Sequence, residues 1–282
     1  MITSVIFSKN RPLQLDLCLN SIDRNFVDST QNIVIHNNSN GFKEAHKLLE
    51  SEHPEVEFWP QGVSLFGDVL LAAKVAKNDY VCFFTDDDIF YVPFAPRKYN
   101  IFTNPNIACL SLRMGLNICQ RSHNGVVGVD THKEVFEVDE DLFAWSKTSH
   151  TYGSYWSYSL SVDGHIFRRE DIIHMMSELC FLGDKCGGQE TPNHLESSLQ
   201  RFWTISPNFM VSPRHSVVVN SPNNRVQQSH EDNKSGETYS YDENYLLGKY
   251  MSGGRINLDY LNFSDIKCPH TEINLMEGFN DI

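Results

Sequence analysis

The strongest constraint on the fold is an alternation of short apolar runs with amphipathic or apolar helix-like segments over the first 112 residues. The predicted strands are 2–8, 33–35, 56–59 and 80–84, and the predicted helices between them are 12–22, 42–52 and 65–76. Strands that alternate with helices at this spacing form βαβ units, whose strands lie parallel in one sheet. We therefore expect an α/β fold with a mostly parallel central sheet flanked by helices.

The rest of the chain has a different pattern, with shorter segments and clusters of aromatic residues. A strand at 107–112 is followed by runs at 126–129, 135–138 and 142–145, which predict a small antiparallel meander. The pair Asp163-Gly164 stands between two alternating runs and predicts a hairpin. We expect one compact domain with three parts, at 1–112, 113–240 and 241–282, the last being a peripheral extension.

Composition narrows the classes of function. The 282 residues include 23 Lys and Arg against 36 Asp and Glu, a net charge of −13, which argues against a surface that is basic all over and binds nucleic acid by charge. No apolar run approaches the roughly 20 residues of a membrane helix, and no secretion signal opens the chain. Seven scattered cysteines without a CxxC pair suggest neither a disulfide framework nor a zinc site. We expect a cytoplasmic protein.

The sharpest local signal is the acidic triplet Asp86, Asp87 and Asp88, which follows the apolar run 80–84 directly. Three adjacent carboxylates repel one another unless a cation or hydrogen-bond donors compensate. Strand alternation would place Asp86 and Asp88 on one side and turn Asp87 away. Such carboxylates suit Mg²⁺ or Mn²⁺, which commonly bridge to phosphates. The alternative is a solvated turn, or a helix N-cap at Asp88.

The ends of three predicted strands together resemble a known family. The runs 5–12 (VIFSKNRP), 33–39 (IVIHNNS) and 80–88 (YVCFFTDDD) are similar to the nucleotide-sugar-binding half of GT-A glycosyltransferases of the family-2 type, bacterial or phage. The resemblance covers about 2–112 well and 154–230 more loosely. It implies a Rossmann-like GT-A fold, with 1–112 as the donor half and a smaller mixed acceptor-side and catalytic region at 113–240.

The resemblance also implies roles for individual residues. The donor-binding residues would be Ser8, Asn10, Arg11, Asn37, Asp68, Asp86 and Arg225, with Gly67 beside Asp68. Asp86 would contact the ribose and the divalent metal, and Asp88 would be the main metal ligand. The family usually has an acidic residue that reads the base where Asn37 stands, and uridine is the default nucleoside. The stretch 62–73 lacks the family's Ala-Arg-Asn.

The second half is expected to supply the catalytic base. The runs 162–169 (VDGHIFRR) and 192–199 (PNHLESSL) look similar to the acceptor side of certain family-2 enzymes. An inverting sugar transfer needs a carboxylate that takes the proton of the acceptor hydroxyl. Glu196 is the first candidate, Glu190 the second and Asp163 the third. The alternative for Glu196 is an acid that stabilises a helix start through the helix dipole.

A C-terminal loop closes over the donor in many GT-A enzymes and gives a histidine to the metal. His230 fits that place, Arg225 would contact the diphosphate, and His215 is a rival metal ligand. A lone histidine near a strand is more often a structural residue than a ligand.

The expected function is a hexosyl or pentosyl transfer from a nucleotide diphosphate sugar, most simply a UDP-sugar, to a hydroxyl, with Mn²⁺ or Mg²⁺ and with inversion. The acceptor is either a surface glycan or a hydroxymethylated base of phage DNA, and the location a bacterial cytoplasm or that of a phage host. A DNA acceptor would need a basic groove. Its candidate residues are Arg97, Lys98, Arg113, Arg121, Arg168, Arg169, Arg201 and Arg214.

Two other functions stay open at this point. A sugar-phosphate nucleotidyltransferase shares the superfold, but it usually has a Gly-rich signature after the first strand, and 8–11 contains no glycine. A non-catalytic nucleotide- or glycan-binding protein could keep the fold without turnover. The acids at 86, 88 and 196 count against that alternative. The sequence does not indicate an oligomeric state.

Overall fold

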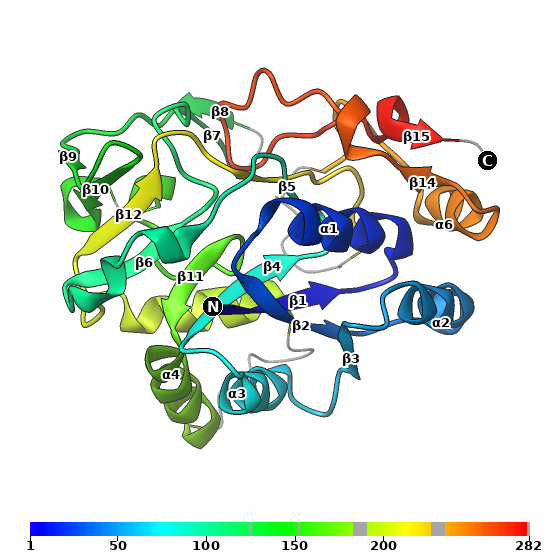
Figure 1. Cartoon of the computed structure of the whole chain (residues 1–282), viewed down its shortest axis with the longest axis horizontal. Coiled ribbons are helices and arrows are strands. Elements are labelled where there is room, and N and C mark those ends of the chain that lie inside the picture. Colours follow the sequence, from blue (N-terminus) through cyan, green and yellow to red (C-terminus); the bar gives the residue numbers. More distant parts are fainter. Residues whose placement is uncertain (124–125, 152, 183–190, 227–234, 281–282) are drawn as a thin grey trace.

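The computed structural model describes residues 1–123, 126–151, 153–182, 191–226 and 235–280. In this part of the chain, nine strands form one sheet in the order β3-β2-β1-β4-β11-β6-β12-β10-β9 (Figure 1). Their bounds are β1 Ile2–Ser8, β2 Ser29–His36, β3 Glu57–Pro60, β4 Tyr80–Thr85, β6 Ile107–Ser111, β9 Phe136–Glu137, β10 Leu142–Ser146, β11 His165–Arg168 and β12 Phe209–Pro213.

Most strands of the sheet run in one direction. β3, β2, β1 and β4 are parallel neighbours, and β12 is parallel to β6. β11 is antiparallel to both β4 and β6, and β10 is antiparallel to β12 and β9. Only β11 and β10 among the nine therefore oppose the rest. The predicted α/β class with a mostly parallel sheet is confirmed.

Helices cover both faces of the sheet, as the strand order requires. Their bounds are α1 Pro12–Asn25, α2 Lys43–Glu52, α3 Leu65–Val75, α4 Arg169–Phe181, α5 Pro192–Leu199 and α6 Glu243–Met251. Right-handed crossovers from β1 to β2 to β3 put α1 and α2 on one face, and the return from β3 to β4 puts α3 on the other. Accordingly α1 packs against α2 and α6, while α3 packs against α4 (Figure 1).

Two local predictions for the second half were wrong. The run 126–129 (β8, Val126–Val129) pairs with β7 (Gln120–His123), whereas β10 joins the central sheet, so the three runs do not form a meander. The Asp163-Gly164 pair does not turn a hairpin. It precedes β11, a central strand that gains more hydrogen bonds between β4 and β6 than a two-stranded hairpin would provide.

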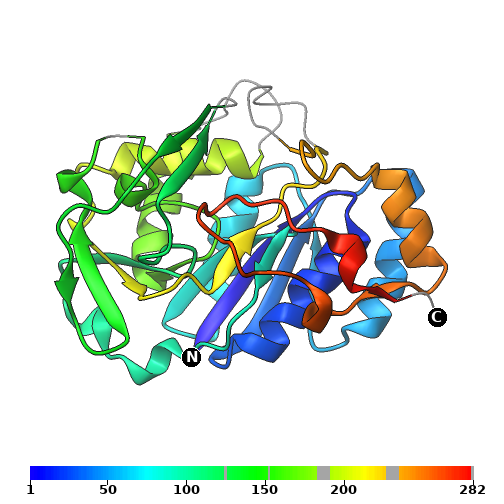
Figure 2. The ribbon, with the colours of Figure 1, turned by 90° about the horizontal axis from the view of Figure 1, so that it is seen from above.

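The C-terminal segment returns to the middle of the molecule. β13 (Val218–Asn220) pairs with β5 (Asp88–Phe90), and His270 forms a bridge to Asn220. β14 (Arg255–Ile256) and β15 (Phe279–Asn280) form a separate ribbon. Seen from above, the red C-terminal segment runs back over the yellow segment that contains β13 (Figure 2). This return places residues of the chain end beside the acidic triplet.

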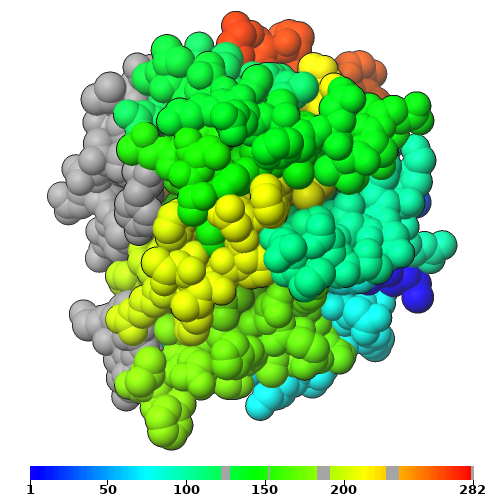
Figure 3. Space-filling view, turned by 90° about the vertical axis from the view of Figure 1, so that its left-hand side faces the viewer, coloured from blue at the N-terminus to red at the C-terminus, as the bar shows by residue number. Residues whose placement is uncertain are grey.

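The middle of the chain forms one flank of the molecule. The coloured part of the face seen in Figure 3 is mostly teal, green and yellow. Strands from these segments extend the sheet beyond β4. Strands β1 to β4 and these later strands thus share a single sheet and core. No helix within the described residues has the length and apolar character needed to cross a bilayer.

Candidate functional site

The candidate site lies where β1, β2 and β4 end, at the carboxyl edge of the sheet. The Asn37 amide donates to the Ser8 carbonyl at 3.0 Å, and the Asp86 amide donates to the Phe7 carbonyl at 3.0 Å. These backbone bonds hold the three strand-end loops side by side. The polar residues that follow each strand are therefore brought to one edge, as parallel strands dictate.

Arg11 holds two members of the acidic triplet. Its Nη1 lies 2.9 Å from Asp86 Oδ1 and 2.8 Å from Asp87 Oδ2, and its Nη2 donates to the Asn224 carbonyl at 2.5 Å. The Lys9 amide donates to Asp86 Oδ2 at 2.9 Å. Arg11 and Asp86 are 9% and 3% exposed. A buried guanidinium thus neutralises the first part of the triplet.

The prediction that Asp87 points away from its neighbours was wrong. Residues 86 and 87 form a turn between β4 and β5, so strand alternation stops before them. Asp87 turns inward, shares Arg11 with Asp86, and accepts from Asn220 Nδ2 at 2.8 Å. The same Asn220 amide contacts Asp88 Oδ1 at 3.1 Å.

Asp88 and Asp163 meet around Thr85. The Thr85 amide donates to Asp88 Oδ2 at 2.8 Å, and Thr85 Oγ1 lies 3.4 Å from Asp163 Oδ1. Asp163 also accepts from Arg113 Nη1 at 2.9 Å, in a pair whose arginine is 2% exposed. Asp163, the third candidate base, therefore belongs to the same cluster as the triplet.

Glu196 joins the cluster from α5. Its Oε1 accepts from the Val162 amide at 3.1 Å, and it faces Arg113 and Asp163. Burial, and then Asp163, raise the pKa of Glu196 to about 7, and Arg113 opposes the rise. The hydroxyl of Tyr158 bonds to the same carboxyl group. A carboxyl group with a pKa near neutrality is suited to general acid–base catalysis.

His270 completes the cluster from the C-terminal segment. Its Nε2 lies 3.5 Å from Arg113 Nη1 and 3.9 Å from Asp163 Oδ2, and its Nδ1 lies 3.2 Å from Asn220 Oδ1. The Tyr155 ring packs near both His270 and Arg113, with ring centroids 5.5 Å apart on the histidine side. Burial lowers the pKa of His270, which favours a neutral imidazole.

The cluster carries more negative than positive charge. Five carboxyl groups face two guanidinium groups among the described residues; the members are Asp86, Asp87, Asp88, Asp163, Glu196, Arg11 and Arg113. Burial, Asp163 and Asp87 raise the pKa of Asp88 well above its usual range. Hard carboxylate oxygens with surplus negative charge are the donor set that Mg²⁺ and Mn²⁺ prefer. Asp88 and Asp163 thus fit a divalent cation.

Some predicted site residues lie apart from this cluster. Asn37 is exposed, with its Nδ2 3.5 Å from Gln61 Oε1. Asp68 accepts from the Gly62 amide at 2.7 Å and so closes the loop before α3. His215 and Arg225 are exposed, although Asn224, next to Arg225, accepts from Arg11. Glu190 and His230 lie outside the described residues.

Ser8 and Asn10 are close to the triplet. Asn10 adopts a positive φ of 55°, donates its amide to Asn38 Oδ1 and accepts the Ser39 amide, which joins the first two loops. Ser8 is 6% exposed, and its buried Oγ has no hydrogen-bond partner in the part of the chain that the structure describes. Both residues therefore line the edge to which the resemblance assigns the nucleotide.

The candidate basic residues do not form one groove. Arg113 is buried in the carboxylate cluster. Arg168 pairs in register with Tyr80, at the opposite end of β4 from Asp86. Lys98 pairs with Asp141 at 2.9 Å, and Arg214 pairs with Glu137. These four of the eight candidate residues therefore do not supply the charge pattern that a DNA acceptor would require.

Three residues of the cluster were missed as site residues in the sequence. Arg113 stands two residues past the strand 107–111, and its strand-end position was the same signal that marked Asp86. Asn220 lies in β13, and nothing in its local sequence distinguishes it. His270 lies in a segment without a recognisable motif, and only its return to the sheet brings it to Asp163.

Comparisons with known proteins point to one class of enzyme. Over 210 residues the chain is 25% identical to the bifunctional glycosyltransferase pgtA of Dictyostelium discoideum, a match that covers 68% of this chain and 27% of that protein. The similarity is to a glycosyltransferase. The chain spans about a quarter of that relative's length. No family model matches the chain.

Two solved structures are also similar, at low sequence identity. The mannosyltransferase PcManGT from Pyrobaculum calidifontis, in complex with GDP-Man and Mn²⁺, is 12% identical, with a TM-score of 0.44 over 80% of this chain and 58% of that one. Residues 1–349 of TarS from S. aureus are 13% identical, with a TM-score of 0.42 over 75% of this chain and 57% of that one.

Proposed function

We propose that this chain is a metal-dependent glycosyltransferase that moves a sugar from a nucleoside diphosphate donor, a UDP-sugar, to a hydroxyl acceptor with inversion. The observation that carries the proposal is the meeting of the acidic triplet with Asp163 and Glu196 at the carboxyl edge of the sheet. The similarity to a curated glycosyltransferase supports the same reaction class.

The residues divide the reaction between two carboxylate groups. Asp88 and Asp163 would hold a divalent cation, which neutralises the charge that develops on a departing diphosphate. Glu196 takes the proton of the acceptor hydroxyl while the oxygen of that hydroxyl forms the new bond to the anomeric carbon. The bond from that carbon to the phosphate oxygen breaks, and the nucleoside diphosphate leaves with the electron pair.

Glu196 is a better base than Asp163 on two grounds. Its raised pKa, about 7, lets it be deprotonated and still hold a proton strongly near neutral pH. Asp163 has one oxygen, Oδ2, paired with the buried Arg113 at 2.9 Å, and its other oxygen is assigned to the cation, so it has no oxygen left for the acceptor proton. Arg113 then orients Asp163 and also limits the rise in the pKa of Glu196.

A glycan is favoured over DNA as the acceptor. Four of the eight candidate basic residues count against a groove, because Arg113 is buried, Arg168 lies at the far end of β4, and Lys98 and Arg214 are paired with acids. A polyanion would therefore meet a surface whose cations are largely neutralised. Acceptor binding measured at low and at moderate salt concentration tests this point, because the affinity for a DNA acceptor would fall steeply as salt is added.

The test is transfer from a panel of UDP-, GDP- and dTDP-sugars with Mn²⁺, measured as release of the nucleoside diphosphate. Wild type is expected to turn over a UDP-sugar. Glu196→Gln is expected to bind it but to lose about 10²–10⁴-fold in turnover. Asp88→Asn is expected to lose the activity that Mn²⁺ supports. Glu178→Gln, an exposed glutamate of α4, is the control. Failure of wild type on all donors, or full activity of Glu196→Gln, contradicts the proposal.

A further inference from the structure

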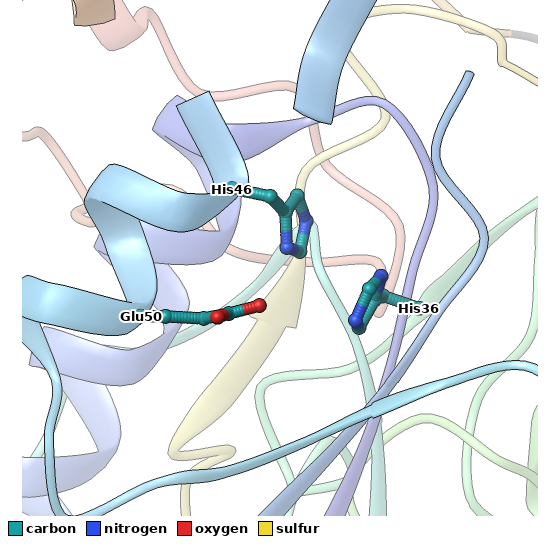
Figure 4. A group of neighbouring side chains, drawn as sticks. All are labelled: His36, His46 and Glu50. Carbon is teal, nitrogen blue, oxygen red and sulfur yellow. The ribbon is translucent and has the colours of Figure 1, made fainter. Parts of the chain in front are cut away.

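A second group of metal-ligating side chains lies away from the carboxylate cluster. His36 ends β2, and His46 and Glu50 stand four residues apart on α2, so that both α2 side chains share one face of the helix. One ligand atom from each of the three lies within 4.8 Å of the other two. In Figure 4 the Glu50 carboxylate points toward the two imidazole rings.

The buried member of this group lacks a hydrogen bond. His46 is 2% exposed, and neither of its ring nitrogens makes a hydrogen bond to any of the described residues. Its ring stacks on His36 with the centroids 4.5 Å apart, and Phe58 meets it edge-on at 6.2 Å. A buried polar group without a hydrogen bond is unfavourable, so a ligand that accepts its lone pair would remove this penalty.

Both imidazoles are uncharged near neutral pH. Burial, and then His36, lower the pKa of His46 to about 3, and burial lowers the pKa of His36. Neutral rings keep the lone pair that coordinates a cation. Glu50 is exposed, so it adds a carboxylate and leaves the outer side of the site open to water.

We propose that His36, His46 and Glu50 form a binding site for Zn²⁺ at the end of β2. Two imidazoles and one carboxylate, with a water in the fourth position, are a common ligand set for this ion. The softer imidazole donors distinguish the site from the all-carboxylate cluster around Asp88, which suits Mg²⁺ and Mn²⁺. The inference does not depend on the proposed function.

Asn38 determines which ring nitrogen of His36 carries the proton. Its Nδ2 donates to His36 Nδ1 at 2.9 Å, which places the proton of the neutral ring on Nε2, and its Oδ1 accepts the Asn10 amide at 2.9 Å. If zinc binds Nε2 of His36, the proton of the ring must sit on Nδ1. That N–H then needs a hydrogen-bond acceptor, whereas Asn38 presents its amide donor there. An aspartate at 38 would accept from both Asn10 and His36, and a carboxylate in that place orients metal-bound histidines.

The experiment titrates the full chain with ZnCl₂ by calorimetry, after iodoacetamide has blocked accessible thiols and with excess Mg²⁺ present. Wild type is expected to bind one Zn²⁺, His46→Leu and Glu50→Gln to bind it at least about 10-fold more weakly, and Asn38→Asp about 10-fold more tightly. His174→Gln, an exposed histidine of α4, and Asp88→Asn should match wild type.

Two results would overturn the proposal. One is wild-type zinc affinity in both His46→Leu and Glu50→Gln; the other is loss of zinc binding in Asp88→Asn, which would place the ion in the carboxylate cluster. Circular dichroism checks the fold of each variant. Glu50 is exposed, so Glu50→Gln and Asn38→Asp decide the question if the buried substitution His46→Leu prevents folding.

Discussion

Replacing Arg11 by methionine is expected to destabilise the protein far more than replacing an exposed arginine. Arg11 is 9% exposed and bonds to Asp86, Asp87 and the Asn224 carbonyl. Methionine fills much of the same volume but leaves two buried carboxylates without their cation. The decrease in the free energy of unfolding therefore measures how much the arginine stabilises the acidic triplet.

The expected loss of unfolding free energy is about 3–5 kcal/mol, the range for removing one partner of a buried ion pair. The matched control is Arg24→Met. Arg24 pairs with Asp259 at 2.6 Å, but the two side chains are 52% and 59% exposed. Solvent screens such a pair, so its loss should change stability by less than about 1 kcal/mol.

Urea denaturation at neutral pH, followed by circular dichroism, measures both variants against wild type. The deficit of Arg11→Met should shrink as the pH falls from about 8 to about 5. Burial already raises the pKa of Asp86 to about 6, and Arg11 opposes that rise. Without Arg11 the folded state binds protons more tightly than the unfolded state, so lower pH stabilises it.

A second substitution separates charge from packing. Adding Asp87→Asn to Arg11→Met removes one uncompensated carboxylate and should recover part of the loss, whereas a packing defect would be unaffected. The reasoning is refuted if Arg11→Met costs no more than Arg24→Met, or if its deficit is the same at pH 5 and pH 8.

Three further predictions concern the reaction, the metal and the backbone. The transferase kcat/KM should rise with pH through about 7 as Glu196 loses its proton, and a flat profile would exclude Glu196 as base. Mn²⁺ at about 100 times its Kd should stabilise wild type by about 2.7 kcal/mol, measured in a thermal melt. Asp88→Asn should show no such stabilisation, and an equal stabilisation of this variant would show that Asp88 is not a metal ligand. Gly164→Ala should cost about 1–2 kcal/mol in urea denaturation, because Gly164 has a φ of +63° and a Cβ there would lie 3.3 Å from Val218; an unchanged midpoint would contradict the strain.

The carboxyl-edge placement of the first loops followed from the sequence. The apolar runs and their spacing predicted β1, β2, β3 and β4 to within a few residues. Parallel strands carry the residues after each strand to one edge, so the approach of Ser8, Asn10 and Arg11 to Asp86 needed no tertiary information. Hydrophobic periodicity is a local property, which is why it was readable.

The partners of the acidic residues were not readable, because they depend on contacts between distant segments. Alternation along a strand predicted that Asp87 would turn away, but the turn after Thr85 brings it to Arg11. Likewise the Asp163-Gly164 pair has the local sequence of a hairpin turn. The residues after it instead form β11, which pairs with β4 on one side and β6 on the other.

The sequence by itself determined the α/β class, the order of strands and helices in the first 85 residues, and the acidic triplet that follows β4. Only the tertiary structure decided which charges compensate that triplet and what joins it. Arg113, Asn220 and His270 reach Asp163 and Asp88 from three separate segments. Electrostatic compensation acts through space over a few ångströms, and partners that lie between 50 and 132 residues apart along the chain leave no periodic trace of it in the sequence.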